Sequence, residues 1–217
     1  KIFKIKLKEI IFNYGLANKK LIKNLSIEMN LKFPVIISGS SGSGKTTLAN
    51  IISGIYLPEK GEVVYIDSNN NEYNSKKYNV NVGYVTQNIH LFRGTIKEFL
   101  CEDKIIDVKH IYEVLSSVGL LDFIKANGGI DTKVVEGGRS FSGGQIRRLG
   151  IAKMLLAGSQ VIILDEPTAG LDDKNKNYLL ETIKKLSTNY IIIIISHDKI
   201  DLQNSIKINL DNLNSEK

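Results

Sequence analysis

The sequence has 217 residues, of which 42% are hydrophobic and 24% are charged, and its formal net charge is +6. These values exclude a disordered or fibrous chain and fit one large globular domain. The single cysteine, Cys101, excludes an internal disulfide, and no apolar run reaches the length of about 18 residues that a membrane-crossing helix requires.

The positive charge is compatible with anionic partners but identifies none, because the lysines form no long basic run. No signal peptide is recognisable, so a reducing compartment is expected. The chain opens at Lys1 without a methionine, and we expect it to be a fragment of a longer polypeptide.

The first elements in chain order predict a small, mostly antiparallel sheet. Strands are expected over residues 2–14 and 21–31, joined by a turn over 15–19, and over 62–66 after a turn at 58–61. Residues 68–81 are polar and rich in asparagine, so a surface loop without chemistry is expected there.

The segment 35–48 predicts a phosphate-binding loop. Residues 35–37 have the β-branched content of a buried strand, and residues 48, 51, 52 and 55 form one apolar face of a helix. The residues between them satisfy the pattern G-x-x-x-x-G-K-[ST], in which glycines let the backbone wrap around a polyphosphate. A serine- and glycine-rich linker would not stand between a buried strand and an amphipathic helix.

In this loop the amides of residues 41–47 would face the phosphates at the positive end of the helix dipole. Lys45 would contact the β- and γ-phosphates, and the Thr46 hydroxyl would bind Mg²⁺. The expected nucleotide contacts are Gly39, Ser40, Ser41, Gly42, Ser43, Gly44, Lys45, Thr46 and Thr47.

Further along, strands and helices alternate. Strands are predicted over 82–86, 161–164 and 190–195, and helices over 143–157 and 174–187, the second capped by Asp172. Residues 95–127 are helical in pattern and 128–138 form a glycine-containing loop, so a helical lobe over about 88–157 is inserted in the core. Residues 198–217 are predicted to form a short helix and an edge strand.

This alternation predicts an α/β fold with a mostly parallel sheet covered on both faces. Ligands then bind beyond the carboxyl ends of the strands, where the loop, Gln87, Asp165, Glu166 and His197 are all expected. A carboxylate pair that directly follows four buried residues carries a desolvation cost that function usually explains.

With these elements in place, the chain resembles the nucleotide-binding domain of ABC (ATP-binding cassette) transporters over roughly residues 5–201. The most specific match is FSGGQ at 141–145, which resembles the family signature LSGGQ with Phe in place of Leu. Physically it is a second glycine-rich helix start, although Ser142 also suits a plain N-cap. The resemblance implies one ATP-binding domain over 1–217, a P-loop NTPase core with an antiparallel β subdomain and a helical subdomain that carries the signature.

The resemblance also implies roles for single residues. Asp165 supports Mg²⁺, Glu166 polarises the attacking water, and His197 contacts the γ-phosphate. Gln87 matches the Q-loop, a contact to Mg²⁺ and water, and Asp172 lies in the D-loop. The signature residues Ser142, Gly143, Gly144 and Gln145 bind ATP held by a second subunit, and metal contacts fall to Thr46, Gln87 and Asp165.

One aromatic side chain, Tyr14, leaves two interpretations open. Tyr14 matches the aromatic that stacks on adenine, and a tyrosine packed on the sheet accounts for it nearly as well. His90 and His110 are interpreted as structural.

Two segments resemble exporters in particular. QNIHLFRGTIKEFL at 87–100 is similar to the segment after the exporter Q-loop, and TKVVEG at 132–137 is similar to the loop TxVGExG, with Val135 in place of its first glycine. The implied partners are a second nucleotide-binding domain and transmembrane domains on the same polypeptide, at the cytoplasmic face of a membrane, with no nucleic acid. The Tyr14-Gly15 pair and the general sequence pattern also resemble peptide exporters, including those for bacteriocins.

Two rival functions share these motifs. A free-standing ATPase subunit of a multi-chain transporter would share all of the chemistry. An ATPase of the same superfamily that acts on ribosomes or DNA usually carries tandem cassettes or long coiled coils, and one cassette without a heptad run argues against it.

Overall fold

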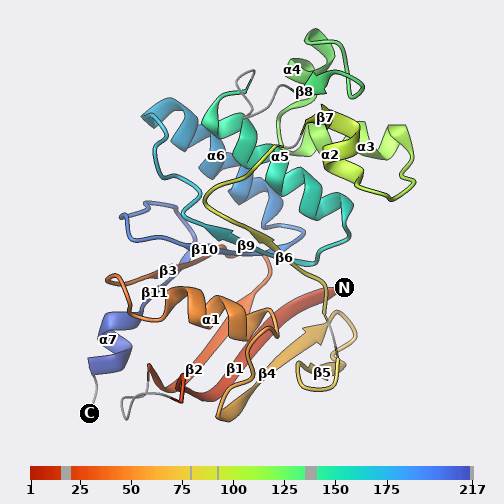
Figure 1. Cartoon of the computed structure of the whole chain (residues 1–217). Helices are drawn as coiled ribbons and strands as arrows, with labels where there is room; N and C mark the ends of the chain where they lie inside the picture. Colours follow the sequence, from red (N-terminus) through yellow and green to blue (C-terminus); the bar gives the residue numbers. More distant parts are fainter. Residues whose placement is uncertain (16–20, 79, 92, 135–140, 216–217) are drawn as a thin grey trace.

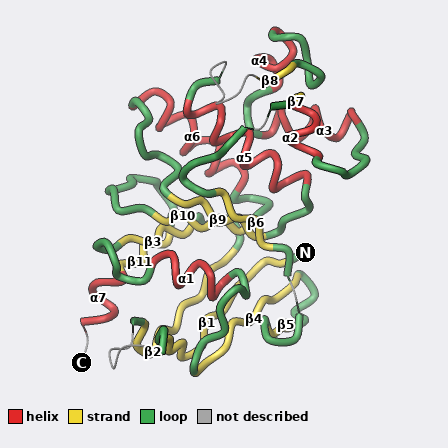
Figure 2. Tube along the Cα trace, viewed as in Figure 1, coloured by secondary structure: helices red, strands yellow, loops and turns green. Residues whose placement is uncertain are grey.

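The computed structural model describes residues 1–15, 21–78, 80–91, 93–134 and 141–215. In these ranges the chain forms a four-stranded, a five-stranded and a two-stranded sheet, and helices lie on both faces of the five-stranded sheet (Figures 1 and 2). The four-stranded antiparallel sheet lies at the bottom of the view in Figure 1, and the helices between residues 96 and 126 lie at the upper right.

The antiparallel sheet has the strand order β2-β1-β4-β5. Its strands are β1 (Ile2–Phe12), β2 (Ile22–Asn30), β4 (Lys60–Asp67) and β5 (Glu72–Asn74). Apart from Gly15, the turn predicted over 15–19 lies outside the described residues.

The loop predicted over 68–81 is wrong in part, because β5 forms inside it and pairs with β4. The Asp67 carboxylate accepts hydrogen bonds from the backbone N–H groups of Asn69 and Asn71 and from the Tyr73 hydroxyl. These bonds hold the tight turn that brings a short polar strand back onto the sheet edge.

The second sheet is parallel throughout, in the order β11-β3-β10-β9-β6. Its strands are β3 (Val35–Ser38), β6 (Val82–Val85), β9 (Val161–Asp165), β10 (Ile191–Ile195) and β11 (Ile206–Asn209). The predicted parallel sheet is confirmed, and β11 is the predicted edge strand.

The central strands are apolar throughout because each of their faces meets a different core. Ile191, Ile193 and Ile195 pack with the antiparallel sheet and the helix α1 (Lys45–Ile52). Ile192 and Ile194 pack instead with the helices on the other face. A strand buried on both faces therefore carries a continuous apolar run, here five isoleucines, rather than an alternating pattern.

The helices of that second face are α2 (Ile96–Cys101), α3 (Val108–Ser117), α4 (Leu121–Ala126), α5 (Gly143–Leu156) and α6 (Asp173–Leu186). Two short strands, β7 (Gly94–Thr95) and β8 (Lys133–Val134), pair antiparallel with each other. The loop predicted over 128–138 is thus wrong at β8, and its residues 135–138 lie outside the described ranges, as do 135–137 of the exporter-like loop.

The chain continues after β11 as α7 (Leu210–Ser215). The longest helices, α5 and α6, have 14 residues each. Across the described ranges, no helix combines the length and the apolar character that crossing a bilayer requires.

Candidate functional site

The strand registers bring the predicted site loops to one edge of the parallel sheet. Ile195 of β10 is paired with Ile37 of β3 on one side and with Asp165 of β9 on the other. The residues that follow these positions are the glycine-rich loop, Ser196 and Glu166. Three segments far apart in the sequence therefore end side by side.

The glycine-rich loop is shaped by one close approach and one left-handed backbone conformation. A Cβ atom at Gly39 would come within 2.5 Å of Ser43 Oγ, and Gly44 has φ +101°, which side chains resist. The loop ends at Lys45, the first residue of α1, so the unpaired amides of the helix start face the loop.

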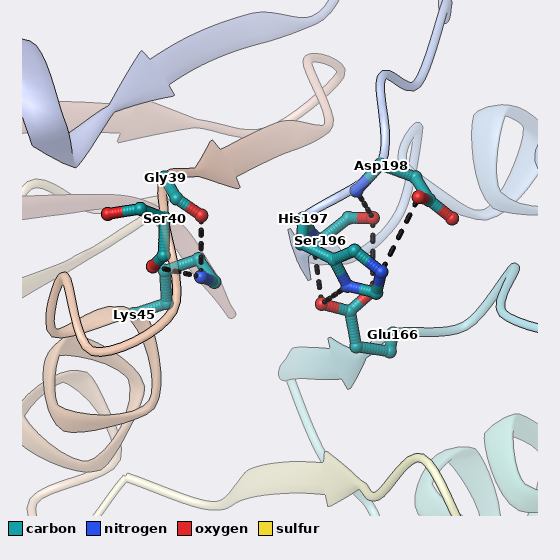
Figure 3. Close-up of polar contacts among 7 residues, drawn as sticks. All are labelled: Gly39, Ser40, Lys45, Glu166, Ser196, His197 and Asp198. Carbon is teal, nitrogen blue, oxygen red and sulfur yellow. Dashed lines mark hydrogen bonds and ion pairs between the residues drawn. The ribbon is translucent and has the colours of Figure 1, made fainter.

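The Lys45 ammonium lies inside this loop. Its Nζ donates to the carbonyl oxygens of Gly39 over 2.7 Å and of Ser40 over 2.9 Å (Figure 3). These two bonds use two of the three donors of an ammonium, so the third can meet a phosphate oxygen.

Glu166 is held in an unusual backbone conformation, with φ +47°. Its N–H donates to the Ile195 carbonyl oxygen over 2.9 Å, which ties the residue to the end of β10. Its carboxylate accepts from the Ser196 hydroxyl over 3.1 Å and from the His197 N–H over 2.9 Å. A strained residue fixed by three bonds is typical of functional positions.

The imidazole of His197 also contacts this carboxylate, with Nδ1 2.7 Å from Oε1 (Figure 3). The hydrogen bond and the charge of Glu166, with a smaller contribution from Asp198, raise the pKa of His197 above 6.5, and burial and the charge of Lys45 oppose the rise. The candidate hydrolytic carboxylate and the candidate histidine are therefore a direct pair.

Asp165, at the end of β9, has a partner that the sequence did not reveal. The Tyr84 hydroxyl of β6 donates to its Oδ2 over 2.9 Å. Burial, followed by the charge of Asp165, raises the pKa of Tyr84 and keeps the phenol a donor. In the sequence, the only signal for this contact is that Tyr84 is a hydroxyl-bearing residue in an otherwise apolar strand.

The oxygen donors at this edge fit Mg²⁺. The Thr46 hydroxyl is exposed in the first turn of α1, and the Asp165 carboxylate and the Gln87 amide follow neighbouring strands. In the described part of the chain, no cluster of three or more acidic, histidine or cysteine side chains could hold a metal alone. Such a donor set suits a hard cation that keeps waters and takes other ligands from phosphates.

Tyr14 lies beside the start of α1. Its hydroxyl is 2.6 Å from the Thr47 Oγ1, and its ring packs edge-on against Phe12 and Tyr56. The side chain is nevertheless 56% exposed. Both interpretations of this residue therefore keep support, since it packs on the sheet and also presents a ring near the loop.

The signature residues lie apart from the loop. Ser142 caps α5 in a capping box with Gln145, and Gly144 is close to Asn175 of α6. Helix α5 belongs to the core on one face of the parallel sheet, whereas α1 belongs to the core on the other (Figure 1). The two glycine-rich helix starts of one chain are thus on opposite sides of its central sheet.

The other predicted residues have simpler surroundings. Asp172 caps α6 by accepting from the Asn175 N–H over 2.8 Å, as the sequence predicted, and its hydrogen bonds lower the pKa of Asp172. Gln87 is exposed two residues after β6. His110 is an exposed residue 3.6 Å from Glu113.

Comparison with known proteins decides the family. Residues 22–169 match the family model described as ABC transporter. The chain belongs to the ABC transporter family. Within this family it is an ATPase domain of the exporter type, as its relatives and its structural neighbour indicate.

Three relatives illustrate the likeness. A glutathione/L-cysteine transport system ATP-binding/permease protein of Haemophilus influenzae is 31% identical over 96% of this chain. An ATP-dependent lipid A-core flippase of Pasteurella multocida is 32% identical over 93% of it. A lactococcin-G-processing and transport ATP-binding protein of Lactococcus lactis is 35% identical over 89%.

The chain spans only 37%, 35% and 28% of the lengths of these three relatives. A solved structure of a bacterial Atm1-family ABC exporter with ATP bound aligns with a TM-score of 0.72 and 25% identity, over 91% of this chain and 35% of the other. The similarity covers the ATPase part of much longer proteins.

Proposed function

We propose that this chain is the ATP-hydrolysing motor of an exporter, which pairs with a second nucleotide-binding domain around two ATP molecules and drives transport by membrane domains. The observation that carries the proposal is the meeting of Lys45, Glu166 and His197 at one sheet edge. This edge is where nucleotides bind in parallel α/β sheets.

In the proposed reaction the carboxylate of Glu166 orients the attacking water and accepts its proton. The Ser196 hydroxyl and the His197 N–H each donate to one of its two oxygens, so the carboxylate keeps one orientation. His197 lies against the same carboxylate and would contact the γ-phosphate. Phosphoryl transfer depends mainly on positioning and charge neutralisation, and these groups supply both.

Lys45, the amides of residues 41–47 and the start of α1 would bind the β- and γ-phosphates. Thr46, Gln87 and Asp165 would hold Mg²⁺, with Tyr84 fixing one oxygen of Asp165. When bound, the ion would neutralise charge that develops on the phosphate oxygens. Tyr14 would stack on the adenine.

A second copy or a paralogue would complete the site. Because α1 and α5 start on opposite sides of the central sheet, the signature residues of one chain do not face its own loop. Ser142, Gly143 and Gly144 of a second domain would close over the γ-phosphate, and ATP would stabilise the closed pair because it binds that state better.

The names of the relatives suggest which other domains work with this ATPase. Two of them are ATP-binding/permease or flippase proteins about three times as long as this chain, so membrane domains on the same polypeptide are the proposed partner. The ATPase would then work at the cytoplasmic face of the membrane.

Replacing Glu166 by Gln tests this proposal. The E166Q variant keeps the shape of the side chain but cannot accept the proton, so hydrolysis should fall by about 10²-fold or more while ATP binding persists. With ATP and Mg²⁺, its mass in solution should double. E113Q, which alters an exposed glutamate 3.6 Å from His110, should hydrolyse ATP normally. An E166Q protein that stays monomeric with bound ATP would refute the paired site.

A further inference from the structure

The segment that follows β11 runs directly beside the glycine-rich loop. Strand β11 is paired in parallel with β3 up to Asn209 opposite Ser38, so the next residues of both strands emerge together. Leu210 is 1% exposed, and its Cβ would lie 3.5 Å from a Cβ at Gly39. The start of α7 is therefore packed against the first residues of the loop.

Asp211 makes the polar part of this contact. Its carboxylate accepts the Ser40 N–H over 2.7 Å at Oδ2 and the Ser40 hydroxyl over 2.8 Å at Oδ1. Asp211 is itself held in place, because its N–H donates to Asn209 Oδ1 over 2.9 Å. The bonds from Ser40, with a smaller contribution from the charge of Lys45, lower the pKa of Asp211, so it stays ionised at neutral pH.

Asp211 and Lys45 form hydrogen bonds with opposite sides of the same peptide unit, the one between Gly39 and Ser40. The Ser40 N–H points to Asp211, and the carbonyl oxygen of Gly39, in the same peptide plane, accepts from Lys45. In a trans peptide the N–H and the C=O point in opposite directions, so each contact requires the orientation that the other sets. The glycine before this peptide would otherwise permit it to flip.

We propose that Asp211 is a positioning residue of the ATP site, which fixes the peptide between Gly39 and Ser40 and thereby sets where Lys45 lies in the loop. This inference rests on the proposed role of the loop in binding ATP. Asp211 does not touch the nucleotide; it acts through Ser40. It keeps the Ser40 N–H out of the phosphate cradle and the Gly39 carbonyl turned toward the ammonium.

A simple charge effect predicts the opposite result. A carboxylate near a triphosphate repels it, so removing the charge alone would tighten binding, more for ATP than for ADP. Loss of positioning would instead weaken both nucleotides, and ATP at least as much as ADP, because Lys45 is expected to contact both the β- and the γ-phosphate. The sign of the change therefore separates the two effects.

The test measures the binding of ATP and of ADP, each with Mg²⁺, to the whole chain by titration calorimetry. D211A should raise both dissociation constants roughly three- to ten-fold, the range expected for a lost hydrogen-bonding carboxylate. D211N keeps an acceptor for the N–H and a donor for the Ser40 hydroxyl, so it should bind nearly as the wild type does. Both variants should still melt in one cooperative transition, which shows that they are folded.

D201A is the matched control, since Asp201 is also a carboxylate of the C-terminal segment but faces Lys207 at 3.7 Å with its side chain 93% exposed. It should leave both dissociation constants unchanged. Unchanged or tighter binding by D211A, or equal weakening by D201A, would overturn the inference while leaving the ATP site intact. A wild-type chain that binds neither nucleotide would refute the proposed function itself.

Discussion

His197 and Glu166 are joined twice: Nδ1 of the imidazole is 2.7 Å from Oε1 of the carboxylate, and the His197 N–H donates to the same oxygen over 2.9 Å. The pair lies at the surface, with the His197 side chain 60% exposed and the Glu166 side chain 12% exposed. Because the carboxylate favours the protonated ring, the pKa of His197 is raised above 6.5.

This pairing predicts a pH-dependent contribution to stability. The pKa of His197 is higher in the folded than in the unfolded chain, so its contribution is complete below 6.5 and is lost as the pH rises through the raised pKa. The melting temperature of the wild type should exceed that of H197Q most near pH 6, and the gap should shrink toward about pH 9.

The matched control is H110Q, since His110 is also exposed but stands 3.6 Å from its carboxylate, Glu113. H110Q should melt close to the wild type, because 3.6 Å is too long for a hydrogen bond. Added salt should narrow the gap for His197, because an exposed pair is screened. A gap that widens as the pH rises would contradict the assignment of the proton to this ring.

Lys45 provides a second prediction. Replacing it by Ala removes the ammonium that would meet the phosphates, and it releases the Gly39 and Ser40 carbonyl oxygens. The affinity for ATP with Mg²⁺ should fall by about ten-fold or more, as expected for the loss of a charge-assisted contact. K45R should not restore it, because a planar guanidinium cannot replace a compact ammonium in a tight loop.

Calorimetric titration of ATP into K45A, K45R and K207A checks this. K207A removes a lysine whose Nζ lies 3.7 Å from Asp201, and it should bind as the wild type does. Equal affinity of K45A and the wild type would mean that the loop does not bind phosphate.

The sequence predicted the parts of this site that depend on local pattern. The strand, loop and helix over 35–48 follow from a motif and two periodicities, and the N-cap role of Asp172 follows from its place before an amphipathic helix. The parallel sheet followed from the alternation of apolar strands and helices.

The missed contacts depend instead on strand register. Tyr84 reaches Asp165 because β6 pairs with β9, and Asp211 reaches Ser40 because β11 pairs with β3. Spacing along the chain does not reveal which strands are neighbours. Strand β5 was missed for another reason, since its polar residues pair only because Asp67 organises the preceding turn.

Tyr84 leads to a third prediction. Y84F keeps the ring but removes the hydroxyl that donates to Asp165 Oδ2 over 2.9 Å. The carboxylate then loses the bond that fixes its orientation, so more Mg²⁺ should be needed for half-maximal ATP hydrolysis, by roughly three- to ten-fold. At saturating Mg²⁺ the rate should recover.

A direct check uses Mn²⁺, whose binding to the ATP-loaded chain can be followed by electron paramagnetic resonance, and Y84F should bind it more weakly. Y73F is the matched control, since the Tyr73 hydroxyl donates to Asp67 over 2.9 Å, a carboxylate of the antiparallel sheet. An unaltered metal requirement in Y84F would show that Asp165 needs no such support.

Tyr14 gives the last prediction and separates its two interpretations. If its ring stacks on adenine, Y14A should weaken ATP binding by about ten-fold or more, the range of aromatic–base stacking, and Y14F should retain it. If the ring only packs on Phe12 and Tyr56, Y14A should lower the melting temperature without changing the affinity. We expect the first result, because the side chain is 56% exposed and has little packing to lose.

Y78A is the matched control for Tyr14. The Tyr78 side chain is 53% exposed and meets one neighbouring ring edge-on, that of Tyr73, so its loss removes a similar aromatic surface away from the loop. It should leave ATP affinity unchanged. Y14F should lose only the hydroxyl contact to Thr47 Oγ1, at 2.6 Å, which costs about 1 kcal/mol of stability. Stacking on the base needs the aromatic ring but not the hydroxyl. ATP affinity should therefore be kept in Y14F and lost in Y14A.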